Sequence, residues 1–356
     1  MKRRAIDAHM HVCQWFLDSG ETSFNVLERY QKDNCLEAVD IMCCSNNANL
    51  WNGYEMDQNI LAAIVKMEYP NTYIHGCMYI PDTEKITGEF SFENQLETLM
   101  EMGFDGIKFC EFKPDSYKVH KMDKRMEELE KYFSYCEKHQ IPMCWHVADP
   151  ETFWDESKVP EAAKKSGWFY GDGSFPTYES LYDQTFGILD RHPNINVVLA
   201  HAFFMSFAPD KMQAIFEKYP NVKMDLAPGW EMFDGFRKYY EEWSGLFRRY
   251  SDRILFATDA TMSSGIQSVD LLADRVLRFL TTDETFEVPG NHTAHGIKLE
   301  EEHLDNILCQ NFKRVVGAKP HMLQRSSLKK YMEHFLPLIP ASKNRAMISE
   351  YYRKHF

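Results

Sequence analysis

Five residues of types that bind metal ions or transfer protons come at the ends of short apolar runs. His9 and His11 close the first run of the chain, with one residue between them. Alternate side chains of an extended strand share a face, so both imidazoles could hold one ion. His146, His201 and Asp259 each end an apolar run of their own. This recurrence favours one shared metal site over five unrelated residues.

The residue types indicate which chemistry such a site would perform. Zn²⁺ and similar divalent ions take imidazole nitrogen and carboxylate oxygen at about 2.0–2.2 Å. A catalytic site leaves one position open, and the ion lowers the pKa of a water there from about 15.7 toward about 7. A nearby carboxylate or imidazole then takes or returns the proton. We therefore predict a divalent ion, Zn²⁺ first and Mn²⁺ or Fe²⁺ as alternatives, that activates water against a small molecule.

Each residue also has an ordinary structural interpretation. A single histidine at a strand end is commonly held by hydrogen bonds within the fold, and Asp259 could cap a following helix. Lys108, inside a further apolar run, could reach solvent at the rim of a barrel. The joint pattern favours the metal site, because the other histidines of the chain do not repeat it.

Strand-sized apolar runs alternate with longer amphipathic stretches through most of the chain. Near-continuous apolar strands are typical of a parallel sheet covered by helices on both faces, and eight such units predict a (β/α)8 TIM barrel of the α/β class. The competing doubly wound sheet would require a glycine-rich phosphate turn, which the sequence lacks. The predicted strands are residues 5–9, 38–43, 73–79, 106–110, 141–146, 196–201, 222–226 and 254–258, and the predicted helices are residues 26–34, 57–69, 92–102, 124–139, 178–191, 209–219, 235–250 and 266–281.

In such a barrel the carboxyl ends of the strands surround one cup, where the predicted site residues would converge. Two parts fall outside the repeat. The connection 147–176 is long enough to be functional, and helical stretches beyond residue 317 are expected to wrap the outside. We predict a single domain over residues 1–356, with the barrel at about 4–317 and an extra C-terminal helical extension at about 318–356.

Composition narrows the class of protein. The 356 residues carry a formal net charge of −13 at pH 7, which argues against nucleic acid or an anionic membrane as partner. No apolar run has the length of a signal peptide or a membrane span. Nine cysteines in this context predict free thiols in a reducing, cytoplasmic location. The expected partner is a small-molecule substrate, and a homodimer, common among barrels, is kept open.

The segments around these residues resemble the amidohydrolase superfamily. The pattern is similar, more narrowly, to the amidohydrolase-related (amidohydrolase 2) branch that includes aminocarboxymuconate semialdehyde decarboxylase, and it covers about residues 4–317. The motifs that carry the resemblance are Asp7-Ala8-His9-Met10-His11, Gly106-Ile107-Lys108-Phe109, Ile141-Pro142-Met143-Cys144-Trp145-His146, Leu199-Ala200-His201-Ala202, Phe256-Ala257-Thr258-Asp259 and Asn306-Ile307-Leu308-Cys309-Gln310-Asn311-Phe312.

The resemblance implies a role for each matched position. It implies that His9, His11, His146 and Asp259 bind one ion, usually zinc. It implies that Asp259 also accepts the proton of the activated water. It further implies that His201 stands beside the metal and polarises the substrate or transfers a proton.

Lys108 marks a departure from the family pattern. Many relatives follow the lysine of the fourth strand with Leu-His-Pro, whereas Phe-Cys-Glu follows Lys108. Elsewhere in the superfamily a carboxylated lysine on this strand bridges two ions, but the matched branch normally holds one. We predict one ion, with Lys108 as a contact of the substrate or of the ligands.

The sequence leaves the reaction open between three alternatives. A decarboxylase needs a group that holds the substrate carboxylate, most simply an arginine. The segments after the strands offer few arginines and many aromatic residues, which favours hydrolysis of an apolar, aromatic or sugar-like molecule over non-oxidative decarboxylation. A non-catalytic binding protein would be expected to have lost a ligand, yet all five positions are filled. The predicted substrate contacts are Lys108, Trp15, Trp154 and Trp230, with Lys113 and Lys118 as further cations.

Overall fold

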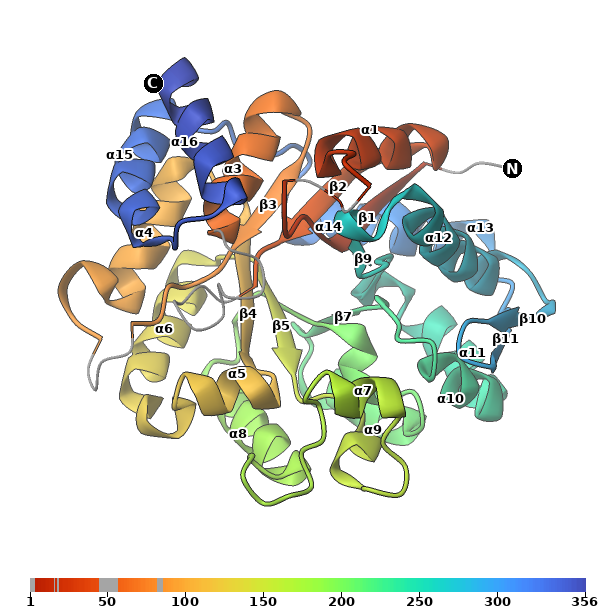
Figure 1. Cartoon of the computed structure of the whole chain (residues 1–356). Helices are drawn as coiled ribbons and strands as arrows, with labels where there is room; N and C mark the ends of the chain where they lie inside the picture. Colours follow the sequence, from red (N-terminus) through yellow and green to blue (C-terminus); the bar gives the residue numbers. More distant parts are fainter. Residues whose placement is uncertain (1–3, 16, 18, 45–56, 82–85) are drawn as a thin grey trace.

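The computed structural model describes residues 4–15, 17, 19–44, 57–81 and 86–356. Within these residues nine strands form one parallel sheet, in the order β8-β7-β6-β5-β4-β3-β2-β1-β9 (Figure 1). Every predicted strand overlaps one of the first eight strands, with ends that differ by a few residues. The strands of the sheet are β1 (Ala5–His11), β2 (Leu36–Met42), β3 (Tyr73–Gly76), β4 (Gly106–Phe112), β5 (Met143–Val147), β6 (Val197–Leu199), β7 (Lys223–Asp225), β8 (Ile254–Leu255) and β9 (Ala260–Thr261).

β8 and β9 are two parts of one bent segment that closes the barrel. β8 pairs with β7, whereas β9 pairs with β1. Between them the backbone N–H of Ala8 donates to Phe256 O at 3.0 Å, and that of Asp259 donates to His9 O at 2.9 Å. The sheet therefore returns to its first strand, which confirms the predicted TIM barrel of the α/β class.

Helices follow the strands and cover the outside of the sheet (Figure 1). In α12 (Ile266–Thr281) the buried residues Val269, Ala273, Val276 and Leu280 recur every three or four positions and form one apolar face against the barrel. The other helices up to the end of the barrel are α1 (Ser23–Asp33), α3 (Gln58–Glu68), α4 (Phe92–Met102), α5 (Pro114–Val119), α6 (Met126–His139), α7 (Glu161–Lys165), α8 (Tyr178–Arg191), α9 (Pro209–Lys218), α10 (Met232–Lys238), α11 (Tyr240–Arg249), α13 (Glu301–Asp305) and α14 (Asn311–Val315).

One predicted helix is wrong in its extent, and one hairpin was not predicted. Residues 235–250 form parts of α10 and α11, because Tyr239 leaves the helical region with φ −112° and ψ 47°. After α12 the chain forms an antiparallel hairpin of β10 (Thr285–Val288) and β11 (His292–His295). β11 contacts α10, so the hairpin packs on the outer layer of helices.

The predicted C-terminal helices are present as α15 (Arg325–Phe335) and α16 (Lys343–His355). α15 packs against α3 and α4, and α16 lies beside α3 (both blue in Figure 1). Asn59 Nδ2 donates to Tyr331 OH at 3.0 Å, and Tyr351 OH donates to Glu68 Oε1 at 2.6 Å, which ties the extension to the barrel. Every helix in the described part of the chain is too short or too polar to span a bilayer.

Candidate metal centre

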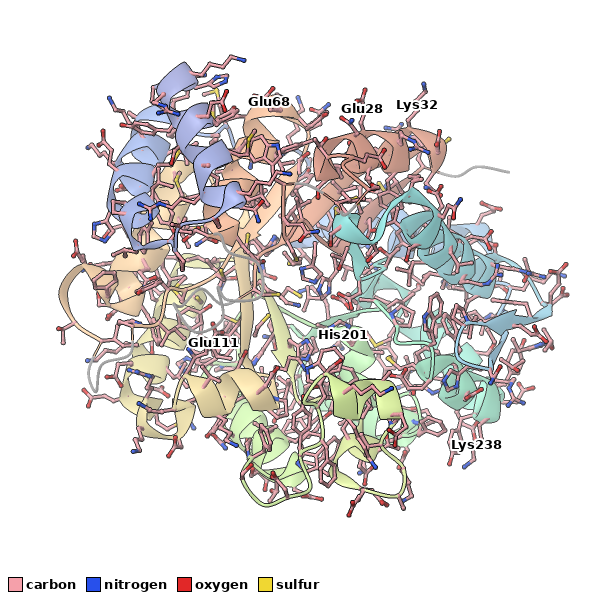
Figure 2. All side chains as sticks on the ribbon, in the orientation of Figure 1. Glu28, Lys32, Glu68, Glu111, His201 and Lys238 are labelled. Carbon is pink, nitrogen blue, oxygen red and sulfur yellow. The ribbon has the colours of Figure 1, made fainter. Side chains whose placement is uncertain are left out.

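The five residues predicted from the sequence lie at the carboxyl ends of the strands. Four of them belong to two three-residue groups whose donor atoms lie within 4.8 Å of one another, whereas His146 belongs to neither group and contacts His201. His9 and His11 lie on β1, His146 on β5, His201 two residues after β6, and Asp259 in the bend between β8 and β9. His11 Nε2 lies 3.0 Å from Asp259 Oδ1, and His9 Nε2 lies 3.6 Å from the same oxygen. His201 Nε2 is 3.0 Å from His146 Nδ1. The rings of His9 and His201 are 5.0 Å apart, and Figure 2 labels His201 near the middle of the molecule.

Sharp backbone turns place these side chains at the strand ends. His201 and Asp259 have positive φ angles of 57° and 60°, and Ala148, two residues after His146, has 60°. This left-handed region costs residues other than glycine about 1–2 kcal/mol, and such outliers cluster at functional sites. The packing around these residues therefore holds their backbone in conformations that the unfolded chain rarely adopts.

The hydrogen bonds of His146 and His201 fix where each ring carries its proton. His146 Nε2 lies 2.9 Å from Ala148 O, and His201 Nδ1 lies 2.8 Å from Ala227 O. A carbonyl oxygen only accepts, so these two nitrogens carry the N–H groups. The remaining nitrogens, His146 Nδ1 and His201 Nε2, face each other with their lone pairs. A proton or a metal cation between them makes this contact favourable.

The two histidines of β1 follow the same rule. His11 Nδ1 donates to Met42 O at 2.7 Å, which leaves its Nε2 lone pair toward Asp259 Oδ1. His9 Nδ1 donates to Asp225 Oδ2 at 2.9 Å, which leaves its Nε2 lone pair on the inner side. All four imidazoles thus bind protein acceptors with their outer nitrogens and keep lone pairs toward one another and toward the carboxylate.

This donor set fits a divalent ion of the zinc type. Such ions select neutral imidazole nitrogen and carboxylate oxygen, and histidine ligands usually donate their other N–H to a carbonyl or carboxylate. His9, His11 and Asp259 offer donor atoms within 4.8 Å of one another, and so do His9, His201 and Asp225. Both oxygens of Asp225 already accept hydrogen bonds, one of them from the backbone N–H of His201. Asp225 therefore supports the histidines and offers less to an ion.

Burial sets the protonation of the site. Burial lowers the pKa of His9 well below its usual value and lowers the pKa of His201 to about 3, so both rings are neutral at pH 7. The side chain of Asp259 is 43% exposed. Its partial desolvation would raise its pKa, but the contact with His11 and the neighbouring histidines hold that pKa well below its usual range. The site thus combines neutral nitrogens with an ionised carboxylate.

Lys108 of β4 lies in direct contact with this group. The side chain is buried, and its Nζ donates to His9 Nε2 at 3.0 Å and to Cys144 Sγ at 3.4 Å. An ammonium and a metal ion cannot share one lone pair. A cation held by His9 Nε2 would therefore take the place of this hydrogen bond and leave Lys108 free to contact another group.

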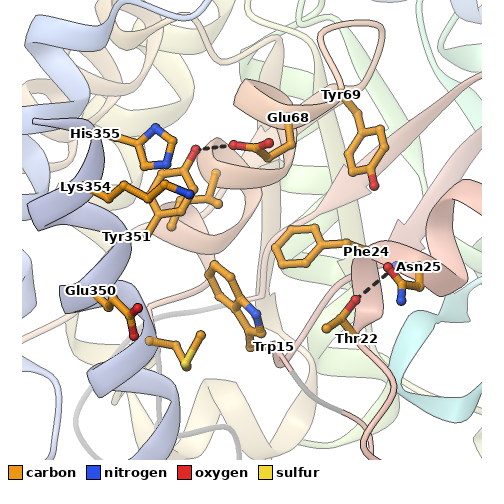
Figure 3. A pocket seen from close by; sticks show the side chains of 12 residues that line it. Trp15, Thr22, Phe24, Asn25, Glu68, Tyr69, Glu350, Tyr351, Lys354 and His355 are labelled. Atoms are coloured by element: carbon orange, nitrogen blue, oxygen red, sulfur yellow. Dashed lines mark hydrogen bonds between the residues drawn. The ribbon is translucent and has the colours of Figure 1, made fainter.

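The three tryptophans that were predicted as substrate contacts lie in different places. Trp15 packs on Phe24 and lines a cavity of about 370 Å³ between the barrel and α16, whose lining includes none of the five site residues (Figure 3). Trp154 Nε1 donates to Pro176 O at 3.0 Å within the connection after β5. Trp230 lies in the segment that joins the carboxyl end of β7 to α10. Their contact with a substrate stays a prediction.

Sequence reasoning missed three buried carboxylates next to the site. Asp7 on β1, Asp149 after β5 and Asp225 at the end of β7 are 0%, 5% and 1% exposed. A carboxylate inside or directly after an apolar run is the signal that could have found them. Burying a charge is costly unless it is paired and hydrogen-bonded, so such a residue implies partners nearby.

Comparison with known proteins identifies the family. Residues 60–317 match the family model for Amidohydrolase, and the chain belongs to this family, as the predicted resemblance indicated. Members of the family generally bind a divalent metal ion and act on small molecules. The comparison with curated proteins found no match.

Solved structures share the fold at low sequence identity. An uncharacterised TIM-barrel protein from Bordetella bronchiseptica is 13% identical, over 88% of this chain and 98% of that chain, with a TM-score of 0.55. A candidate amidohydrolase from Staphylococcus aureus is 14% identical, over 88% and 99%, with a TM-score of 0.54. Dihydroxybenzoic acid decarboxylase from Polaromonas sp. JS666, solved with manganese and the inhibitor 2-nitroresorcinol, is 11% identical, over 88% and 96%, with a TM-score of 0.51. The same fold thus occurs in a decarboxylase and in a candidate amidohydrolase.

Proposed function

We propose that this protein is a metal-dependent hydrolase of small molecules. In this proposal His9, His11, His146 and Asp259 hold one divalent ion, zinc first among the candidates. The main support for this proposal is the pattern of hydrogen bonds around the four imidazole rings. Carbonyl and carboxylate acceptors hold the outer N–H groups, so that the inner lone pairs and Asp259 Oδ1 are left for a cation.

The roles of the chain's own residues follow from their positions. A bound ion would supply the charge that lowers the pKa of a water and polarises a substrate carbonyl. Asp259 would accept the proton of that water, because its carboxylate is 43% exposed and lies beside the inner nitrogens of His9 and His11. His201 can take or return a proton at Nε2, since Ala227 O holds its Nδ1. Lys108, released from His9, would contact the substrate.

Non-oxidative decarboxylation, of the aminocarboxymuconate semialdehyde type or of an aromatic acid, is the second candidate. The fold shared with a dihydroxybenzoic acid decarboxylase favours it. Two observations favour hydrolysis. Lys113, a cation that could hold a carboxylate, is already paired with Asp149. Within the described residues, the hydrogen bonds and ion pairs of the five site residues include no arginine.

Metal analysis combined with a substrate panel tests the proposal. We expect the purified protein to hold a divalent ion, the double variant His9→Ala with His11→Ala to lose it, and Asp259→Asn to keep much of it while losing turnover. Cleavage of amides, esters or lactones supports the hydrolase, whereas release of CO₂ from aromatic acids supports the second candidate. Absence of a bound ion, together with no gain in melting temperature on addition of Zn²⁺ or Mn²⁺, would overturn both.

A further inference from the structure

The buried carboxylate of Asp149 contacts His146 on the side of the ring that faces away from His201. Asp149 Oδ1 lies 3.4 Å from His146 Nε2, next to Ala148 O at 2.9 Å. Both acceptors come from the three residues that follow His146, because the chain turns sharply at Ala148, whose φ is 60°. The N–H at Nε2 is thus shared between a carbonyl and a carboxylate, and the Nδ1 lone pair is left toward His201.

Two residues from other segments hold Asp149 in place. Lys113, directly after β4, forms an ion pair with Asp149 Oδ2, and the Tyr170 hydroxyl donates to the same oxygen at 2.6 Å. Lys113 Nζ also donates to Tyr170 OH at 3.2 Å and lies 4.6 Å above the Trp168 ring. Asp149, Lys113 and Tyr170 therefore each contact the other two, and we call this group the Asp149 clamp.

Tyr170 connects the clamp to the long segment between β5 and α8. Its ring is 1% exposed and packs with Phe153, Val159 and Ala163 in a small apolar core of that segment. The backbone N–H of Tyr170 donates to Phe153 O at 2.9 Å. The segment is thus an internally packed unit, and Tyr170 joins it to Asp149 at the back of the metal centre.

We propose that Asp149, held by Lys113 and Tyr170, is a positioning residue that fixes His146 in the tautomer offering Nδ1 to the ion. A hydrogen bond to an ionised acceptor is about twice as strong as one between neutral groups, so Asp149 adds to what Ala148 O provides. Asp149 pairs with the Lys113 ammonium and accepts a hydrogen bond from the Tyr170 hydroxyl, and both contacts stabilise its ionised form. This inference rests on the proposed function, since it concerns the same ion.

The experiment compares Asp149→Asn with the wild type and with Asp155→Asn. Asp155 lies in the same segment, is 39% exposed and pairs with Lys158 away from the clamp. Zn²⁺ affinity is measured by competition with a chromophoric chelator, and the visible spectrum of Co²⁺-substituted protein reports the ligand geometry. Loss of a carboxylate behind a histidine ligand typically weakens metal affinity about 10–100-fold, which we expect for Asp149→Asn. Asp155→Asn should match the wild type in both measurements.

A second readout separates positioning from general stability. Long-range ¹H–¹⁵N spectra of metal-free protein with labelled histidine should show His146 protonated at Nε2 in the wild type. Asp149→Asn should show an increased share of the tautomer protonated at Nδ1, because Ala148 O still accepts from Nε2 but the carboxylate is gone. Lys113→Met and Tyr170→Phe supply further variants should Asp149→Asn fold poorly. Each of these two substitutions should weaken Zn²⁺ binding when it is made alone. Combined with Asp149→Asn, each should weaken binding by less than it does alone, because Lys113 and Tyr170 act through the same carboxylate.

The two proposals fail in different ways. Wild-type protein that binds neither Zn²⁺ nor Mn²⁺ refutes the proposed function. Wild-type protein that binds Zn²⁺, combined with an Asp149→Asn variant of equal affinity and an unchanged His146 tautomer, overturns the clamp alone.

Discussion

Asp7 of β1 and Thr258 after β8 are joined by two hydrogen bonds across the seam where the barrel closes. The Thr258 hydroxyl donates to Asp7 Oδ2 at 2.6 Å, and its backbone N–H donates to Asp7 Oδ1 at 3.1 Å. Tyr30 OH donates to the same carboxylate at 2.7 Å, and the backbone N–H of His9 does so at 3.2 Å. One buried carboxylate therefore holds both β1, with its histidines, and the bend that carries Asp259.

Removing the Thr258 hydroxyl should destabilise this seam. In Thr258→Val the methyl replaces a group that donates to Asp7 and accepts from the backbone N–H of Ala260 at 3.1 Å. Leaving buried partners unsatisfied costs about 1–3 kcal/mol each, so we expect the free energy of unfolding to fall by about that amount in urea titrations. Thr72→Val is the matched control, because Thr72 is also fully buried and its hydroxyl has no hydrogen-bond partner in the described residues. Equal losses in the two variants would contradict this role of Asp7 and Thr258.

Asp57, the N-cap of α3, should make the stability of the protein depend on pH. Burial raises the pKa of Asp57 to about 7, despite the backbone N–H of Ile60 that donates to its carboxylate. The folded state therefore keeps this proton between about pH 4 and pH 7, where the unfolded chain releases it. The contribution of Asp57 to stability is full below about pH 4 and is lost as the pH rises through 7.

Asp57→Asn tests this dependence. Asparagine caps a helix as well as aspartate does but does not titrate. Relative to the wild type, the variant should gain a few kcal/mol of unfolding free energy between pH 5 and pH 8, measured by urea unfolding in the presence of a chelator. If the difference in unfolding free energy between Asp57→Asn and the wild type stayed constant from pH 5 to pH 8, Asp57 would be ionised in the folded state.

The order of the strands and the convergence of the site residues could be predicted because both follow from local patterns. A buried parallel strand must be apolar over its length, and the first polar residues after it mark the carboxyl end. His146, His201 and Asp259 carry that signal in the sequence. The closed sheet then brings the strand ends together whatever their separation in the chain.

The hydrogen bonds that select the tautomers could not be predicted in this way. His11 and His201 depend on the carbonyl oxygens of Met42 and Ala227, which are 31 and 26 positions away. A backbone carbonyl has no residue type, so nothing in the sequence marks it. The same holds for Trp15, whose place beside α16 depends on where the C-terminal extension packs.

The turn after β6 should contain measurable backbone strain. Residues 201–204 have four consecutive positive φ angles of 57°, 44°, 56° and 53°. Ala202→Gly should relieve the cost of its left-handed backbone and raise the free energy of unfolding by about 1 kcal/mol. Ala200→Gly is the control, since Ala200 is equally buried but has an ordinary φ of −69°. Glycine there should destabilise by about 0.5–1 kcal/mol. Equal effects of the two substitutions would argue against strain in this turn.

Asp259 and Asp225 should respond in opposite ways to loss of charge in the metal-free protein. In measurements at pH 9, the lone pair of His11 Nε2 faces Asp259 Oδ1 at 3.0 Å, because its Nδ1 donates to Met42 O. The amide of Asp259→Asn can donate to that lone pair, so we expect this variant to unfold at higher urea than the wild type in the presence of a chelator.

Asp225 instead accepts N–H groups from His9 and His201. Asp225→Asn should therefore lower the free energy of unfolding by about 1–3 kcal/mol. The histidines should still bind Zn²⁺ in Asp259→Asn, but less tightly than they do with the carboxylate. Added Zn²⁺ should therefore stabilise the wild type more and reverse the order of the two proteins, since an ion present at 100 times its dissociation constant contributes about 2.7 kcal/mol. If Zn²⁺ stabilised Asp259→Asn as much as the wild type, Asp259 would not be a ligand.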